Sequence, residues 1–553
     1  MDPKLWEVID ETMPSFNPTI VEGFHKKEFD QGLQIFERNL RLTFKGIDNK
    51  GVYFRGISRV SPRDFIAFLK EASTKPFDIH KETLYPVKLS FDYKDKSGKM
   101  IPLKDAYVML PYCDRHGDIF IRNTQYSLQF VLAERGLSVT KDNKIFIKVL
   151  GAKFKIGTEY FRYAQVFSDT GNCTKRTSDI NLPASRFYSA TEAWKVSSNK
   201  VPHPLLAWYT FADMGFSKAM ELYGECEYRI GSLDAIAQEC RSEQRWEVIT
   251  LADTRNEKFL GEYVEHDVAL AIRNTNPKRL ELSTMGLQYA CALLYIADCV
   301  SSYFEPSQID EPDYWKLIIG RCSVKANAPE LSILKWMHDH FKSMNGFLDE
   351  DSIKRFASQS ISVTNMFELF NYIIANRSEI IQTTDRADVF HKELASFEFT
   401  IDKLIVAANL FKYDILNNSD LNQGKINRFL SKHFRLKEID SAARAANLIQ
   451  EATPTDNPFV DYVLGCMSQH KVFGSMGKNK TSKEFNPNDS AVAAHHSVAF
   501  VMSSQRPTKP DPDSRGYLAP CIYLIHDRIT GLRPERRELA KQMYHRLNFR
   551  EIK

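Results

Sequence analysis

Residues 110–139 read LPYCDRHGDIFIRNTQYSLQFVLAERGLSV, in which short apolar runs alternate with polar turn residues. The runs at 119–122 and 125–132 are rich in Ile, Phe, Tyr and Val, which favours β-strands. Charged residues and Gly117 precede the first run, a combination typical of a tight turn. The segment therefore predicts a hairpin followed by an extended or helical continuation.

The segments around this hairpin extend the strand pattern. Residues 87–93 alternate apolar and polar side chains, as a half-buried strand does, and 145–150 form a further apolar run. Residues 26–44 have helical spacing. The N-terminal region is therefore expected to mix helices and strands.

Helical periodicity dominates from about residue 200 to 450. Apolar side chains recur at three- and four-residue spacing in residues 331–341, 363–374 and 390–411. Residues 232–239 open with a Ser followed by acidic residues, which indicates the start of a helix. Residues 452–517 are rich in loop-forming residues, and 531–553 form a basic amphipathic stretch. The predicted fold class is α+β and multidomain: a mixed N-terminal region, a large helical lobe, a loop-rich region and a C-terminal helix.

The overall composition excludes several classes of protein. Among 553 residues, 74 basic and 70 acidic side chains give a net charge of +4, so overall charge alone does not indicate a nucleic-acid-binding protein. The nine Cys residues form no Cys-x-x-Cys pair, which argues against a zinc ribbon. Their odd number in a long chain is typical of a protein in a reducing cytosol. No signal peptide is visible. The apolar stretch 285–304 contains Asp298 near its middle, which favours a buried helix over a membrane span.

Two basic clusters near the C-terminus are the candidate nucleic-acid-binding residues. Gly474 and Gly477 lie within the first cluster and permit close backbone approach. Lys and Arg side chains neutralise phosphates without reading base sequence, although a solvated loop is the alternative. The candidate residues are Lys471, Lys478, Lys480, Lys483, Arg506, Lys509 and Arg515.

No residue is predicted to be catalytic or to bind metal. His338 and His340 are two positions apart on a predicted helix, so they face apart. Residues 511–513 read Asp-Pro-Asp and lack the Gly and third Asp of a polymerase magnesium loop. Neither a P-loop nor a nucleophile elbow is present in the sequence.

Two stretches resemble the second-largest, β-type subunit of multisubunit RNA polymerases, in the order found in that family. In the first, residues 110–139, the matching positions are Gly117, Phe120, Ile121, Asn123, Thr124 and Gln125. The second, 457–524, resembles the fork region: its matching positions are Asn457, Pro458, Asp461, Gly474, Gly477, His495 or His496, Pro507, Thr508 and the run 516–523. Residues 464–467, Leu-Gly-Cys-Met, replace a basic cluster of the family.

The resemblance implies an architecture and a role. Residues 1–200 would form the start of the protrusion and lobe, 201–450 the helical lobe and returning segments, 451–530 the fork-like region and 531–553 the basic C-terminal helix. Such divergence is similar to the split β subunits of giant (jumbo) bacteriophages, of which this chain would be the N-terminal part. It would act without catalytic residues of its own in DNA-directed RNA synthesis.

The resemblance also implies partners and a location. The partners would be a C-terminal β-type chain, β′-type chains, template DNA and RNA. The chain itself would hold no cofactor, and Mg²⁺ would bind the β′-type partner. We expect the protein in the host cytoplasm and not in a membrane, with packaging in the virion or a phage compartment as the alternative locations. The alternatives are a virion structural or ejection protein, or a replication-associated single-strand-DNA-binding protein.

Overall fold

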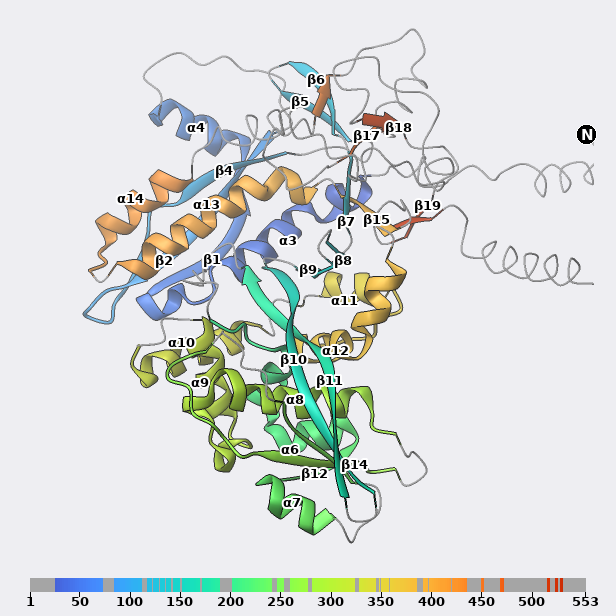
Figure 1. The fold of residues 1–553 in the computed structure, drawn as a ribbon. Coiled ribbons are helices and arrows are strands. Elements are labelled where there is room, and N and C mark those ends of the chain that lie inside the picture. The colour runs from blue at the N-terminus through green and yellow to red at the C-terminus, as the bar shows by residue number, and fades with distance from the viewer. Residues whose placement is uncertain are drawn as a thin grey trace, which may run out of the picture. The chain divides into compact units, whose positions relative to one another are not determined.

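The computed structural model describes residues 25–434 with gaps, and five short strands beyond residue 434. The longer gaps are 73–83, 112–116, 189–200, 241–245, 253–258, 277–280, 324–327, 345–347 and 385–390. The chain divides into two compact units. Unit 1 comprises Met1–Arg135 and Asp385–Lys553, and unit 2 comprises Gly136–Thr384, so unit 2 is an insertion in the sequence of unit 1. The predicted α+β fold class is confirmed, as Figure 1 shows.

Unit 1 contains a four-stranded antiparallel sheet. Strand β2 (Leu84–Lys94) pairs with β1 (Val52–Arg59) on one edge and with β3 (Met100–Pro102) and β4 (Ala106–Pro111) on the other. On β2, Val87, Leu89 and Phe91 alternate with more exposed residues and are almost fully buried. The alternation seen in residues 87–93 therefore predicted this strand correctly.

Two helices from distant parts of the chain pack on this sheet. Helix α3 (Lys26–Thr43) contributes the buried Phe36 and Leu40, and α13 (Phe397–Asn417) contributes Phe411. The ring of Phe411 lies edge-on, 5.9 Å from that of Phe44, at the end of α3. The prediction of a helix over 390–411 was partly wrong, because β15 (Lys392–Ala395) is a strand and α13 begins after it.

A hairpin was predicted with its turn near Gly117, but the hairpin in this segment is formed by residues 118–128 and turns after Gly117, so the predicted position of the turn was wrong. Strands β5 (Asp118–Ile121) and β6 (Thr124–Leu128) pair with Ile121 opposite Thr124, and Asn123 has a φ of 69°. Asn tolerates this left-handed conformation better than most residues. Gly117, where the turn was predicted, instead precedes β5, and β16 (Ile449–Glu451) completes a three-stranded sheet.

Unit 2 contains a seven-stranded sheet with a long hairpin at its centre. Strands β10 (Ala152–Asp169) and β11 (Asn172–Tyr188) pair over their whole length (Figure 1). The order is β12-β14-β13-β10-β9-β8, with β11 beside β10. The remaining strands are β8 (Leu137–Val139), β9 (Ile145–Val149), β12 (Cys226–Gly231), β13 (Glu247–Leu251) and β14 (Ala269–Asn274). The region predicted as helical thus also contains strands.

Helix α8 (Thr284–Cys299) lies in the core of unit 2. Its residues from Tyr289 to Cys299 are all buried, and Ser283 caps its N-terminus by accepting a hydrogen bond from the Gly286 N–H. The prediction of a buried helix in 285–304 is confirmed. No helix in the described part of the chain is long and apolar enough to cross a membrane.

The other helices of unit 2 confirm most predicted segments. Helix α7 begins after Ser232, whose Oγ accepts from the Ala235 N–H at 3.4 Å. The helices are α5 (Leu206–Met214), α6 (Phe216–Ala219), α7 (Leu233–Cys240), α9 (Pro312–Ser323), α10 (Glu330–Met344), α11 (Glu350–Ala357) and α12 (Met366–Thr383). The predicted helix at 531–553 lies outside the described residues. The predicted domain boundaries at residues 200, 450 and 530 stay predictions.

Candidate functional site

Two of the seven predicted nucleic-acid-binding residues lie in described strands. Lys471 ends β17 (Ser468–Lys471) and Arg515 begins β18 (Arg515–Tyr517). These strands pair antiparallel, with His470 opposite Arg515, so the two basic positions are on neighbouring strands. The remaining candidates lie outside the described residues, and they are Lys478, Lys480, Lys483, Arg506 and Lys509.

A six-stranded sheet in unit 1 brings distant segments of the sequence together. Strand β17 pairs in parallel with β7 (Phe130–Glu134), with Lys471 opposite Leu132. Strand β15 lies on the other edge of β7, and β20 (Arg528–Thr530) and β19 (Tyr523–Ile525) follow it. The two stretches that resemble a β-type subunit, about 340 residues apart in the sequence, therefore contribute adjacent strands.

A basic helix, α14 (Gln423–His433), lies against α13 in unit 1. Asn422 caps it by accepting a hydrogen bond from the Lys425 N–H at 2.8 Å, and Ile426 and Leu430 face the core. The charged residues of α14 are all basic. Lys425 and Lys432 are seven positions apart, so they lie on one face of the helix, about 10 Å apart along its axis.

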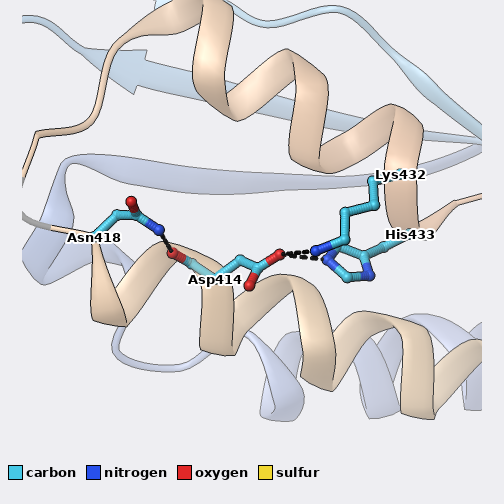
Figure 2. Close-up of polar contacts among 4 residues, drawn as sticks. All are labelled: Asp414, Asn418, Lys432 and His433. Atoms are coloured by element: carbon cyan, nitrogen blue, oxygen red, sulfur yellow. Dashed lines mark hydrogen bonds and ion pairs between the residues drawn. The ribbon is translucent and has the colours of Figure 1, made fainter.

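A shared carboxylate joins α13 to the end of α14 (Figure 2). Asp414 Oδ2 accepts hydrogen bonds from Lys432 Nζ at 2.9 Å and His433 Nε2 at 2.7 Å. An ionised carboxylate only accepts, so Nε2 carries the hydrogen in this contact. Asn418 Nδ2 donates to the Asp414 backbone oxygen at 2.7 Å. The cluster orients the last turn of α14 relative to α13.

Asp414 remains ionised because its donors outweigh its burial. Burial tends to raise the pKa of Asp414, but the hydrogen bonds from His433 and Lys432, with the charges of both, hold the pKa below its ordinary value. The side chain of His433 is 9 % exposed, whereas that of Lys432 is 57 % exposed. Lys432 can therefore still reach a ligand in solvent.

Three buried side chains in the core of unit 2 are joined by hydrogen bonds. Asn371 Oδ1 accepts from Thr210 Oγ1 at 2.8 Å and from Tyr289 OH at 2.7 Å, and all three residues lie in the core. Burial also raises the pKa of the Cys322 thiol to about 12. A thiol kept protonated in an apolar core is a poor nucleophile.

Neither the histidines nor the acidic residues of the described part form a metal centre. His338 lies beside Asp313 at the surface and His340 is buried, so the predicted divergence of the two rings is confirmed. Among the residues that the structure describes, no group of three or more His, Cys, Asp or Glu side chains could hold a metal ion.

The sequence analysis missed α14 as a candidate site. Its signal was present: Lys425, Arg428 and Lys432 follow helical spacing in a segment without Asp or Glu, after the capping residue Asn422. The Lys and Arg residues at 471–483 and 506–515 are more numerous and form a stronger sequence signal than this short helix.

The fold and its surface define an α+β protein of two compact units, whose described part has no cluster of His, Cys, Asp or Glu side chains that could bind a metal ion and carries a basic helix. Residues 8–458 match the family described as non-virion RNA polymerase subunit. The chain belongs to this family and is therefore a subunit of a phage multisubunit RNA polymerase, with other polymerase subunits as its partners. A comparison with curated proteins finds no significant match.

Proposed function

We propose that this chain is the N-terminal part of a split β-type subunit that helps form the DNA and RNA channel of the polymerase. It contributes no catalytic residue. A β′-type partner holds the Mg²⁺ ions that phosphoryl transfer requires, and a separate chain supplies the C-terminal part of β.

One observation carries the β-type assignment most directly. Strands β7 and β17, which belong to the two stretches with β-type resemblance, are parallel neighbours in one sheet. Parallel neighbours need a long crossover connection, and here that connection includes all of unit 2. This arrangement supports an inserted lobe between the start of the subunit and its fork.

The proposed contact with nucleic acid uses the basic residues at 471–483 and 506–515. Lys471 and Arg515 lie on paired strands, which supports a common basic edge. Phosphate contacts of this kind hold template and RNA without reading their sequence. The protein acts in the host cytoplasm and not in a membrane.

Affinity purification from infected cells, followed by mass spectrometry, tests the assignment. We expect a C-terminal β-type chain and a β′-type chain with an Asp-x-Asp-Gly-Asp loop to co-purify. Recovery of capsid or ejection proteins in their place would favour the virion alternative. Tight DNA binding by the purified chain alone would favour the single-strand-binding alternative.

Charge reversal tests the basic loop. Lys478→Glu with Lys480→Glu is expected to lower RNA synthesis by the assembled complex, because two repulsive charges would replace two phosphate ligands. Lys335→Glu with Lys342→Glu, on the exposed face of α10, is the matched control. Equal activity of both variants would contradict the assignment of the loop.

A further inference from the structure

We propose that α14 and the β2–β3 turn together form a phosphate-binding surface for the nucleic-acid backbone. This surface is separate in sequence from the loop at 471–515. The inference rests on the proposed function, because it assumes that the chain lies along nucleic acid in the polymerase.

The charge of the two segments is the first support. Residues 94–104 and 420–433 carry seven basic and two acidic side chains, a surplus larger than the +4 of the whole chain. The basic residues are Lys94, Lys96, Lys99, Lys104, Lys425, Arg428 and Lys432, and the acidic ones are Asp95 and Asp420. Positive charge is therefore concentrated in a small part of unit 1.

Hydrogen bonds join the two segments into one surface. Tyr93 OH donates to the Leu421 backbone oxygen at 2.9 Å, just before α14. The Lys104 N–H donates to Asn427 Oδ1 at 3.0 Å, in the middle of the helix. The stem of the turn thus lies beside α14, so Lys104 is brought next to a helix more than 300 positions away in the sequence.

Two acidic residues nearby, Asp95 and Asp414, are occupied in local contacts. Asp95 Oδ1 accepts from the Lys96 N–H at 2.7 Å, within the turn. Asp414 supports the helix end by binding Lys432 and His433. These contacts arrange backbone and side chains, and they leave a positive surplus at the surface.

Several of the basic side chains are available to a ligand. Lys96, Lys99 and Arg428 are exposed. Arg428 makes no hydrogen bond or ion pair with the residues that the structure describes. Like charges close together repel one another, and a polyanion that bridges them relieves this repulsion.

A phosphodiester backbone fits the surface better than a compact anion. Lys425 and Lys432 are about 10 Å apart along the helix axis, a span of roughly three base-pair steps. Long Lys side chains adapt to a row of phosphates and need no fixed bidentate geometry. The surface is therefore expected to bind DNA or hybrid without sequence preference.

The test uses the assembled polymerase with Lys96→Gln, Lys99→Gln and Arg428→Gln combined. Binding of labelled DNA is measured between about 50 and 200 mM salt. We expect weaker binding, and the slope of log K against log salt should decrease in magnitude by roughly 2 to 3, about 0.9 for each lost phosphate contact. The matched control exchanges three exposed lysines of unit 2, namely Lys218→Gln, Lys335→Gln and Lys342→Gln.

Each outcome decides the proposal. An unchanged slope in an intact complex would overturn the inference and leave the proposed function in place. Loss of the variant subunit from the complex, with its circular dichroism and melting temperature unchanged, would show a protein-docking surface and also overturn it. If the wild-type chain brings down no polymerase subunits, the proposed function itself fails.

Discussion

Asp298 offers the most direct test of the core of unit 2. It lies on α8 and is only 9 % exposed, and Cys299 Sγ donates to its Oδ2 at 3.5 Å. Burial raises the pKa of Asp298 from 3.8 to about 6, although the Cys299 hydrogen bond lowers it slightly. The folded protein therefore holds this proton more tightly than the unfolded chain does.

This raised pKa makes stability depend on pH in a defined direction. The contribution of Asp298 is complete below pH 3.8 and is lost as the pH rises through about 6. The loss amounts to roughly 3 kcal/mol in total, of which about half falls between about pH 5 and pH 7.5. Asp298→Asn cannot ionise and should not show this loss.

Urea unfolding of the full chain at about pH 5 and about pH 7.5 tests this expectation. Fluorescence of Trp208 and Trp315, both buried in unit 2, reports on the relevant core. Relative to wild type, Asp298→Asn should gain roughly 1 to 1.5 kcal/mol between the two pH values. Glu262→Gln, at an exposed position of the same unit, serves as control.

The reasoning would be refuted if Asp298→Asn differed from wild type by the same free energy at both pH values. Such a result would mean that the carboxyl of Asp298 ionises as readily in the folded protein as in the unfolded chain. A pH-dependent gain that also appeared in Glu262→Gln would point to a general charge effect.

Three further substitutions have defined outcomes in chemical unfolding. Asp414→Asn should lower stability by about 1 kcal/mol at neutral pH. The pKa of Asp414 in the folded wild type lies below 3.8, so the difference in unfolding free energy between Asp414→Asn and wild type should vanish as the pH falls through this lowered pKa. A difference in unfolding free energy that stayed constant with pH would contradict the role of the ionised carboxylate. Gly320→Ala should destabilise by about 1–3 kcal/mol, because its Cβ would lie 2.3 Å from Ile333 Cγ2. Gly424→Ala, whose nearest contact is Asn422 Oδ1 at 3.6 Å, should instead stabilise α14 by up to about 1 kcal/mol, and a loss of stability would show that Gly is required there.

Elements with strong local patterns were predicted well from the sequence. Alternating side chains identified the strand at 87–93, and the apolar stretch 285–304 with Asp298 indicated a buried helix. Where two elements meet, the boundaries were wrong: β15 occupies the start of the predicted helix at 390–411, and the hairpin turn lies at Asn123. A strand partner overrides local preference in such segments.

The candidate site was predicted only in part. Lys471 and Arg515 do lie on paired strands, but no local signal indicated that α14 lies beside residues 102–104. The resemblance to a β-type subunit rested on two separate stretches, and their adjacency through β7 and β17 could not be read from either one.

By itself, the sequence determined which segments are helical or extended and where charge accumulates, because periodicity and composition are local properties of the chain. Only the tertiary structure decided that Gly136–Thr384 forms its own unit, and that α13 returns to the sheet formed by β1 to β4. Contacts between residues hundreds of positions apart depend on how apolar faces and strand edges satisfy one another across the whole fold. The free energy of such long-range contacts cannot be deduced from any short stretch of the sequence.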